Sequence, residues 1–393
     1  MKQGWQLSFW VFIIVLASSC TGVKYLQNDE KLLYKQRIEG VEKANKSELQ
    51  DRITLTPNIR VPFLGAVGVM IYETGKNNYD SAEILSKKEE TLNKIDVKIE
   101  KRKEKGKGIR NLASKRERKL NRFDKKLRQG NLRMRTGVPL ARYDSTAIAN
   151  SALRMTNYLK SKGFRQAEVA IATSQKNKKI TQKFIVQEGP QSYIDSLTII
   201  TGDTALTLLI QEHKQNALIR KGDAYNEDLL IQERNRLELL LKNNGYYTFN
   251  KQFIEYEIEY APDQEDLWVK IIVNKPVETN NHKAFHLDSI IVNTNGNIDV
   301  QLNQAYKGVS YNFGNTFYSA KVIDSRLKMN PSDLYSIDDV INTQKQLLNM
   351  DMFRFVNINF DTTLINNQFV ANIYTAPLQK FQVTQEVGLN VTE

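Results

Sequence analysis

The chain has 393 residues, of which 41% are hydrophobic and 25% charged, and its formal net charge is +12. It contains one cysteine, which excludes a fold held together by internal disulfides, so its domains must be stabilised by their hydrophobic cores. Residues 98–135 hold seventeen Lys/Arg and four Asp/Glu, so the rest of the chain is nearly neutral and is not a uniformly basic protein.

The amino terminus has the pattern of a lipoprotein signal peptide. Lys2 precedes an apolar core at residues 9–17, which is too short to span a bilayer comfortably. Small residues then lead to Cys20 in a sequence that resembles a lipobox, although Leu16 stands four residues before the cysteine rather than three. We predict that residues 1–19 are a signal peptide and that Cys20 carries acyl chains such as palmitate. The alternative is an ordinary secretory signal followed by an incidental cysteine.

Residues 20–190 are predicted to form a first α+β module. Its helices show apolar residues at helical spacing, and its last strands alternate apolar and polar residues. The expected elements are a strand at 32–38, a helix at 46–53, a helix carrying Ile148, Met155 and Leu159, and strands at 169–172 and 180–187.

A basic insertion at about 81–131 interrupts this module between its two helices. Apolar residues at helical spacing on both sides of residues 106–108 (Gly-Lys-Gly) predict a helical hairpin with a thin apolar stripe. The stripe consists of Leu85, Leu92, Ile95, Ile99, Leu112, Leu120, Phe123 and Leu127. We expect the cations to contact anionic lipid head groups or lipopolysaccharide phosphates rather than nucleic acid; the alternative is a solvated arm kept soluble by its charges. The candidate contact residues are Lys101, Arg102, Lys103, Arg116, Arg118, Lys119, Lys125 and Lys126.

Residues 191–277 predict a second module with the order strand, helix, helix, strand, strand. Asn226 is expected to cap the second helix, and Gly245 to end it, because a left-handed cap suits glycine. The expected elements are strands at 193–200, 249–260 and 267–274 and helices at 204–214 and 227–241, the latter with Leu230, Leu237 and Leu241 on one stripe.

Residues 278–378 predict a third module with the same order. Its strands are expected at 285–293, 353–360 and 369–374, and Ser336 with Asp339 resembles a capping box at the second helix. This module is longer than the second, and the excess around residues 309–322 predicts an extra hairpin or loop. The helix-to-strand phrase recurs 82 residues apart at Gly163 and Gly245, and in degenerate form at Asp351.

The repeated modules resemble the POTRA domain. The phrases GVPLARYDSTAIANSALRMTNYLKSKGFRQAEV and GDAYNEDLLIQERNRLELLLKNNGYYTF are similar to the second helix and second strand of that domain. From about residue 31 to 378 the chain resembles the periplasmic half of BamA/TamA-type outer-membrane assembly proteins, in the lipoprotein form of Bacteroidetes-like bacteria. Residues 379–393 alternate like the first strand of a truncated outer-membrane β-barrel. The alternative is a last edge strand of the third module.

No catalytic, metal or cofactor site is predicted. The three histidines are His213, His282 and His286, and the last two flank a strand start, where four residues span about 13 Å, too far to share a metal. We found no nucleophile or phosphate-binding motif. The sequence therefore predicts a protein that is not an enzyme.

The resemblance implies an array at the periplasmic face of the cell outer membrane. The array would bind unfolded outer-membrane protein precursors by strand addition at edges formed by the second strands of the second and third modules, since the third strand is central in such sheets. The expected edge residues are Phe249, Phe253, Glu255, Glu257 and Glu259 in the second module and Phe353, Phe355, Asn357 and Asn359 in the third. Proline at Ile258 and Ile358, or at Glu257 and Asn357, whose side chains should point away from the buried face, is expected to lower precursor capture while the modules stay folded. The alternative is a lipid-anchored scaffold that docks one fixed periplasm-spanning or assembly-complex partner.

Overall fold

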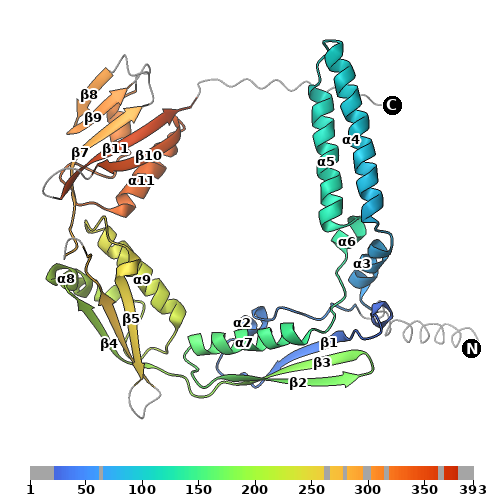
Figure 1. The fold of residues 1–393 in the computed structure, drawn as a ribbon. Helices are drawn as coiled ribbons and strands as arrows, with labels where there is room; N and C mark the ends of the chain where they lie inside the picture. The colour runs from blue at the N-terminus through green and yellow to red at the C-terminus, as the bar shows by residue number, and fades with distance from the viewer. Residues whose placement is uncertain are drawn as a thin grey trace, which may run out of the picture. The chain divides into compact units, whose positions relative to one another are not determined.

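The computed structural model describes residues 22–61, 65–260, 266–277, 281–294, 302–313, 318–361 and 367–378. The chain divides into two compact units, Met1–Gln191 and Ser192–Glu393, in which helices and small mixed sheets alternate (Figure 1). The predicted α+β class and the repeated order of elements are confirmed. The predicted signal peptide with Cys20 and the predicted barrel segment 379–393 lie outside the described residues.

The first unit contains a short 3-10 helix, η1 (Val23–Tyr25), and one three-stranded sheet. Strand β3 (Lys179–Gln187) is central, parallel to β1 (Leu32–Glu39) and antiparallel to β2 (Glu168–Lys176). Helices α2 (Lys46–Asp51) and α7 (Ser145–Ser161) complete the module. The three residues predicted for the apolar stripe of α7, Ile148, Met155 and Leu159, are buried in the core.

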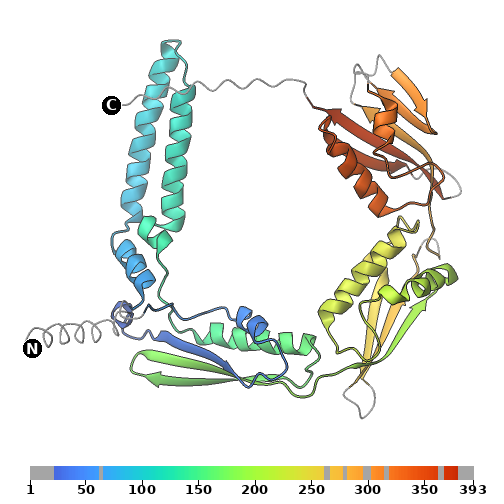
Figure 2. The same cartoon turned by 180° about the vertical axis from the view of Figure 1, so that it is seen from behind.

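The basic insertion forms the predicted helical hairpin within the predicted bounds, and two further short helices flank it. Helices α4 (Ser81–Glu104) and α5 (Arg110–Gln129) lie side by side, and α3 (Val67–Asn77) packs on α6 (Leu132–Thr136) at their base (Figures 1 and 2). Gly137 permits this packing, because an added Cβ would lie 2.4 Å from the backbone nitrogen of Tyr72. The prediction was wrong for Leu85, whose side chain is 45% exposed and lies outside the seam.

The second unit begins with a module built on a sheet in the order β4-β6-β5. Strand β6 (Leu267–Val273) is central, parallel to β4 (Ile194–Thr201) and antiparallel to β5 (Ile254–Tyr260). The other elements are α8 (Thr204–Glu212), η2 (Lys214–Asn216), α9 (Glu227–Lys242) and η3 (Lys251–Phe253). Asn226 caps α9 as predicted, since its side chain accepts a hydrogen bond from the Asp228 backbone N–H.

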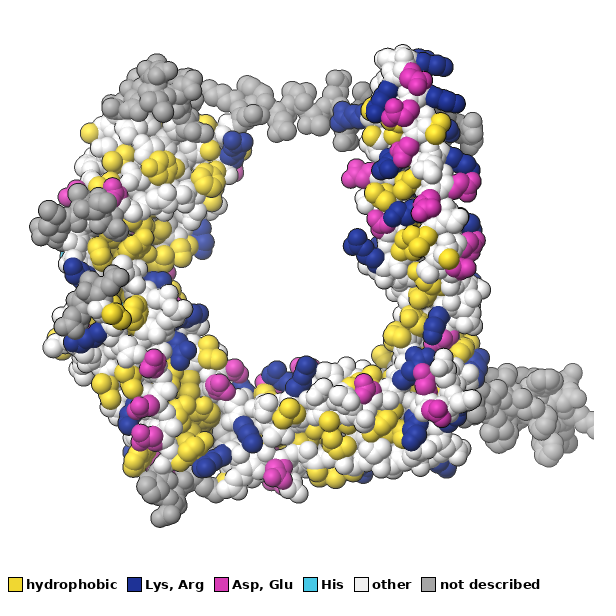
Figure 3. All heavy atoms as spheres, viewed as in Figure 1, with side chains coloured by type: hydrophobic (Ala, Val, Ile, Leu, Met, Phe, Trp, Pro, Cys, Tyr) yellow, Lys and Arg dark blue, Asp and Glu magenta, His cyan; other side chains and the backbone are white. Residues whose placement is uncertain are grey.

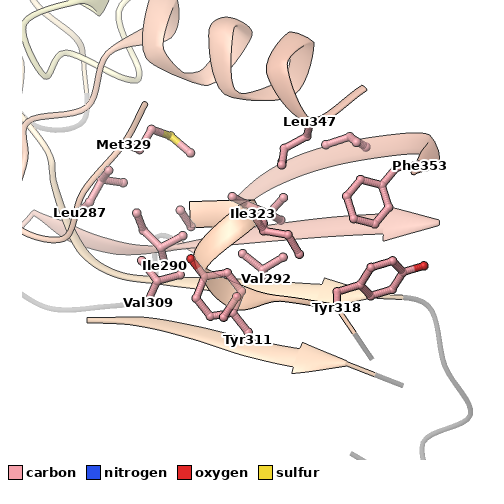
Figure 4. Close-up of a cluster of buried hydrophobic side chains, with 14 of the residues drawn as sticks. Leu287, Ile290, Val292, Val309, Tyr311, Tyr318, Ile323, Met329, Leu347 and Phe353 are labelled. Atoms are coloured by element: carbon pink, nitrogen blue, oxygen red, sulfur yellow. The ribbon is translucent and has the colours of Figure 1, made fainter. Parts of the chain in front are cut away.

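The third module has a five-stranded sheet in the order β10-β11-β7-β9-β8. Its elements are β7 (His286–Thr294), β8 (Leu302–Tyr306), β9 (Val309–Phe313), α10 (Ala320–Asp324), α11 (Ile337–Leu348), β10 (Phe353–Asp361) and β11 (Gln368–Pro377). The predicted extra segment is a hairpin, β8–β9, which begins at Leu302 and joins the sheet because β9 pairs in parallel with β7. Figure 4 shows side chains from β7, β9 and both helices meeting in one core.

The three modules share two backbone features that confirm the repeat. The first strand of each has a one-residue register shift against the central strand, between Leu33 and Lys35, between Ile194 and Ser196, and between Leu287 and Ser289. A residue two or three positions after the end of α7, α9 and α11 has a positive φ, which is +90° at Gly163, +96° at Gly245 and +51° at Asp351. Each left-handed residue turns the chain toward the next strand.

Contacts between the second and third modules centre on the segment that follows α9. The backbone N–H of Gly245 donates to the Tyr335 carbonyl at 2.9 Å, and the Gly245 carbonyl accepts from the Phe285 N–H at 2.8 Å. The ring of Tyr247 packs against four aromatic rings of the third module, those of Phe285, Tyr335, Phe360 and Phe369. These two modules therefore share part of one core.

Among the residues that the structure describes, no helix combines the length and the apolar composition needed to cross a bilayer.

Candidate functional site: free edges of the sheets

Each sheet ends in a strand that pairs on one side within the described chain. Strands β2, β5 and β10 are the second strands of their modules, and each is hydrogen-bonded to a central third strand. The predicted strand order is thus confirmed in all three modules. An edge strand presents alternate backbone N–H and C=O groups that a further extended segment can pair with.

Strand β5 has one face toward the module core and one wet face. Ile254 is buried, and Tyr256 donates its hydroxyl to the Leu230 carbonyl of α9 at 2.9 Å, while burial raises the pKa of Tyr256 above its ordinary value. The exposed face carries a row of carboxylates over β5 (Figure 3). The residues of this row are Glu255, Glu257 and Glu259, as predicted, and Lys270 of β6 pairs with the last two at 3.3 and 2.9 Å.

The backbone of β5 faces the free edge at the residues between these glutamates. The Asn274 N–H donates to the Phe253 carbonyl at 2.7 Å, so residues 253 and 274 form a hydrogen-bonded pair. Hydrogen-bonded pairs alternate along an antiparallel ladder, which places the amide of Glu257 toward β6 and that of Ile258 toward the edge. The expectation that proline at Glu257 would leave the module folded is therefore wrong, because it would remove a donor to β6.

Phe249 and Phe253 were predicted on this edge but lie before the strand. Asn250 accepts a hydrogen bond from the Gln252 N–H, and this cap turns residues 251–253 into a 3-10 helix. Phe249 is buried, and its ring and that of Phe253 lie 4.9 and 4.8 Å from the His282 ring. These two phenylalanines stabilise the module rather than line its edge.

Strand β10 begins with an irregularity that separates its predicted edge residues. Phe353 is buried, whereas a bulge between Phe353 and Phe355 leaves the side chain of Phe355 54% exposed. Asn357 donates its side-chain amide to the Asn359 side chain at 3.0 Å.

One backbone group of the β10 edge is already engaged. Gln344 of α11 donates its side-chain amide to the Val356 carbonyl at 2.8 Å, which identifies Val356 as facing away from β11. By the same alternation Ile358 faces the free edge and Asn357 faces β11. The expectation that proline at Asn357 would leave the third module folded is wrong for the same reason as at Glu257.

The sequence interpretation did not include the β2 edge. We expected a short strand at 169–172, but β2 extends to Lys176, and most of its residues are exposed. Ile171 is 42% exposed although it lies on this strand. The repeated order of elements was the signal that could have identified β2 as the counterpart of β5 and β10.

The predicted anionic-surface residues lie on the hairpin and differ in their partners. Arg116 forms two hydrogen bonds with Asp96 of α4, at 2.5 and 3.0 Å, and these hold the pKa of Asp96 below its ordinary value. Arg116 therefore fastens the hairpin. Lys103 pairs with Glu100 within α4. Cations and carboxylates alternate over the hairpin surface in Figure 3, and Lys101, Arg102, Arg118, Lys125 and Lys126 are exposed, whereas Lys119 is half-buried.

The side chains of His213 and His282 bond to backbone carbonyls. His213 Nδ1 lies 3.0 Å from the Leu209 carbonyl, and His282 Nε2 lies 2.9 Å from that of Asn274. Within the described part of the chain, no three His, Cys, Asp or Glu side chains gather as metal ligands would.

Comparison with solved structures finds similarity to POTRA domains. One similar structure is that of POTRA domains 3–5 of BamA from Haemophilus influenzae. The match covers 90% of this chain and 99% of that structure, with 11% identity and a TM-score of 0.35. BamA from Haemophilus ducreyi lacking POTRA domains 1–3 matches 47% of this chain over 29% of its own, with 11% identity and a TM-score of 0.35. The N-terminal domain of Omp85 from Thermosynechococcus elongatus matches 90% of this chain over all of its own, with 9% identity and a TM-score of 0.27.

No protein-family model and no curated protein matches the chain. This chain spans less than a third of the Haemophilus ducreyi structure.

Proposed function

We propose that the chain is the periplasmic part of an outer-membrane protein assembly or translocation factor. Its modules bind unfolded β-barrel precursors by strand addition and pass them to a barrel. The observation that carries the proposal is the repeated free edge, since β2, β5 and β10 each end a sheet whose third strand is central. Main-chain pairing makes few demands on sequence, so one array can serve many precursors.

The edge strands are short enough to bind a precursor weakly and reversibly. Strand β5 has seven residues, and every second residue directs its N–H and C=O outward. If each backbone hydrogen bond to the precursor contributes as much as one within a protein, it stabilises the complex by about 0.5–1.5 kcal/mol net. A precursor strand therefore gains only a few kcal/mol at one edge, before the cost of ordering it, and can be released to the next.

The proposal includes attachment to the outer membrane. Acylation of Cys20 would hold the array at the periplasmic face, and residues 379–393 would lead into the barrel that receives the precursor. Among the described residues, exposed cations of the hairpin at positions 101–103 would contact anionic head groups or phosphates of the same membrane. Electrostatic attraction of this kind is worth about 1 kcal/mol per cation near an anionic surface.

Proline substitution at outward-facing positions tests strand addition. A chain with both Ile258→Pro and Ile358→Pro loses an outward N–H on β5 and on β10, and proline is tolerated at a sheet edge. The matched control, Ile258→Ala with Ile358→Ala, loses similar side-chain packing and keeps both amides. We expect both chains to be folded by circular dichroism and the proline chain to crosslink an unfolded, labelled β-barrel precursor several-fold less.

Equal precursor crosslinking by the two folded chains would refute capture at these edges. Glu257→Pro provides a check on the hydrogen-bond direction, because it removes a donor to β6 and should unfold the second module. In cells, crosslinking from Phe355 to one stoichiometric protein instead of many precursors would favour the scaffold function.

A further inference from the structure

The second and third modules differ at the edge opposite to β5 and β10. The shared register shift aligns their first strands, so that Leu197 and Ile199 of β4 correspond to Ile290 and Val292 of β7. Strand β7 is covered on its outer side by β9. Strand β4 is the last strand of its sheet on that side.

In the third module the covering strand also fills the space beneath it. Ile290 pairs with Val309, and Val292 pairs with Tyr311, in parallel. The side chains of Val309, Tyr311 and Phe313 are buried in the core. Figure 4 shows Val309 and Tyr311 among residues from β7 and α10, and the Tyr311 hydroxyl donates to Asp324 of α10 at 3.2 Å.

In the second module the corresponding space is open. Only Gly202 and Asp203 lie between β4 and α8, so this module supplies no strand of its own. A pocket of about 690 Å³ borders β4 where β9 borders β7. Leu197 and Ile199 at its floor are half-buried, whereas their counterparts Ile290 and Val292 are fully buried. The apolar wall consists of Ile210, Ala217, Ile219 and Ile271.

Cations line one end of this pocket. Lys214, Arg220 and Lys221 contribute to its lining and are exposed. Arg220 and Lys221 precede Gly222, whose N–H donates to the Ile194 carbonyl, so these two cations lie at the start of β4.

The acidic group in the pocket does not neutralise these cations. Glu233 is buried and bonds to Arg236 at 2.6 and 2.7 Å and to the Leu218 N–H at 3.0 Å. Lys221 Nζ lies 3.4 Å from Asp195 Oδ1 of β4, and the Arg220 guanidinium donates to the Gln215 carbonyl at 3.0 Å. The lining cations Lys214, Arg220, Lys221 and Arg236 still outnumber the carboxylates of Glu233 and Asp195, so a carboxylate on a ligand would complement the basic end of the pocket.

We propose that the outer edge of β4 binds an extended polypeptide segment in parallel, in the register that β9 adopts on β7. Two alternate apolar side chains of the segment occupy the pocket, and an acidic residue that precedes them meets Arg220 and Lys221. This site shares with the proposed function only the mode of pairing, because it lies on the opposite edge of the sheet from β5. The β4 site selects segments by their side chains, because two of these enter the pocket, whereas an edge that pairs through the backbone alone does not.

A disulfide crosslink in a defined register tests the proposal. The probe is a synthetic peptide of two aspartates followed by the sequence of residues 308–313, with cysteine in place of Ser310. The protein is the full chain with Cys20→Ser, which removes its own thiol, and Thr198→Cys. Thr198 corresponds to Ile291, which pairs with Ser310. Neighbouring strands lie about 4.8 Å apart, within the range of about 4.4–6.8 Å between disulfide Cα atoms.

A second peptide with cysteine in place of Asn312 is the register control. Two residues of strand place its cysteine about 8 Å from Thr198, beyond disulfide range. In a glutathione redox buffer we expect at least fivefold more crosslink with the first peptide than with the second. Similar yields from both peptides, or no crosslink above that of free cysteine, would overturn the proposal.

Pocket variants separate this site from the β5 edge. Ala217→Trp fills the pocket and should lower the crosslink yield at least fivefold, and Arg220→Glu with Lys221→Glu should lower it several-fold. Lys345→Glu, an exposed reversal on α11, should leave the yield unchanged. Ile258→Pro should also leave it unchanged while reducing precursor capture at β5. Loss of the peptide crosslink in Ile258→Pro but not in Ala217→Trp would place the peptide on β5 and refute the β4 site.

Discussion

Tyr247 provides a measurable test of the coupling between the second and third modules. Its side chain is half-buried and contacts the rings of Phe285, Tyr335, Phe360 and Phe369, with centroid distances between 5.0 and 6.1 Å. About 100 Å² of buried aromatic surface at ~25 cal/mol/Å² corresponds to ~2.5 kcal/mol. Edge-to-face ring pairs add about 0.5–1.5 kcal/mol. Tyr247→Ala should therefore lower the free energy of unfolding of the second unit by about 3–4 kcal/mol.

Urea unfolding with two probes measures this effect. Fluorescence of Trp268, the last of the chain's three tryptophans, reports the second module, and hydrogen exchange of β11 amides reports the third. In the native chain the two transitions should coincide, because the modules share a core. In Tyr247→Ala they should separate, with the third module unfolding first.

The matched control for Tyr247→Ala is Tyr374→Ala, because the Tyr374 side chain is 44% exposed. This control should change the free energy of unfolding by no more than about 0.5 kcal/mol. Coincident transitions in Tyr247→Ala, or a loss no larger than that of the control, would refute a shared core between the two modules.

Three other outcomes are expected. Cys20→Ala should abolish incorporation of labelled palmitate and release the chain from outer-membrane fractions; retention there would refute lipid anchoring. Reversing residues 101–103 to glutamate, with Arg116 left to fasten the hairpin, should reduce binding to anionic vesicles and its salt dependence, and unchanged binding would remove the hairpin tip from the proposed contact. Burial raises the pKa of Tyr335 to about 12, so the stability that it contributes is complete below about pH 10 and is lost as pH rises toward 12. Tyr335→Phe should raise the pH midpoint of alkaline unfolding, measured by circular dichroism. An unchanged midpoint would show that ionisation of Tyr335 does not cause the loss of stability.

The sequence predicted the order of elements because their signals are local. A cap at Asn226, a stripe at Leu230, Leu237 and Leu241, and a glycine at position 245 each act within a few residues, and all were found as expected. A local signal also explains why the start of the strand that contains β5 was predicted wrongly. The alternation of apolar residues suggested a strand from residue 249, but Asn250 caps a 3-10 turn there, and one short cap outweighs a side-chain pattern.

The sequence could not predict which backbone groups face the edge. Alternation of side chains assigns Glu257 to the wet face of the sheet, but its N–H lies in the plane of the sheet and points to β6. That direction depends on which residue of β6 pairs with which residue of β5. Partner choice is equally non-local for β9, whose parallel pairing with β7 depends on strands that meet only in the folded chain.

The length of the helical hairpin limits the range of its charge. At 1.5 Å per residue, the 24 residues of α4 extend about 36 Å from its base. The Debye length at physiological ionic strength is about 8 Å, several times shorter. Salt therefore screens the tip cations from the sheet at the base of the hairpin. A charge substitution at the tip should not change the electrostatic potential at the sheet, and a substitution in the sheet should not change the potential at the tip. The cations at the tip can attract an anionic surface only when that surface lies within about a Debye length of them.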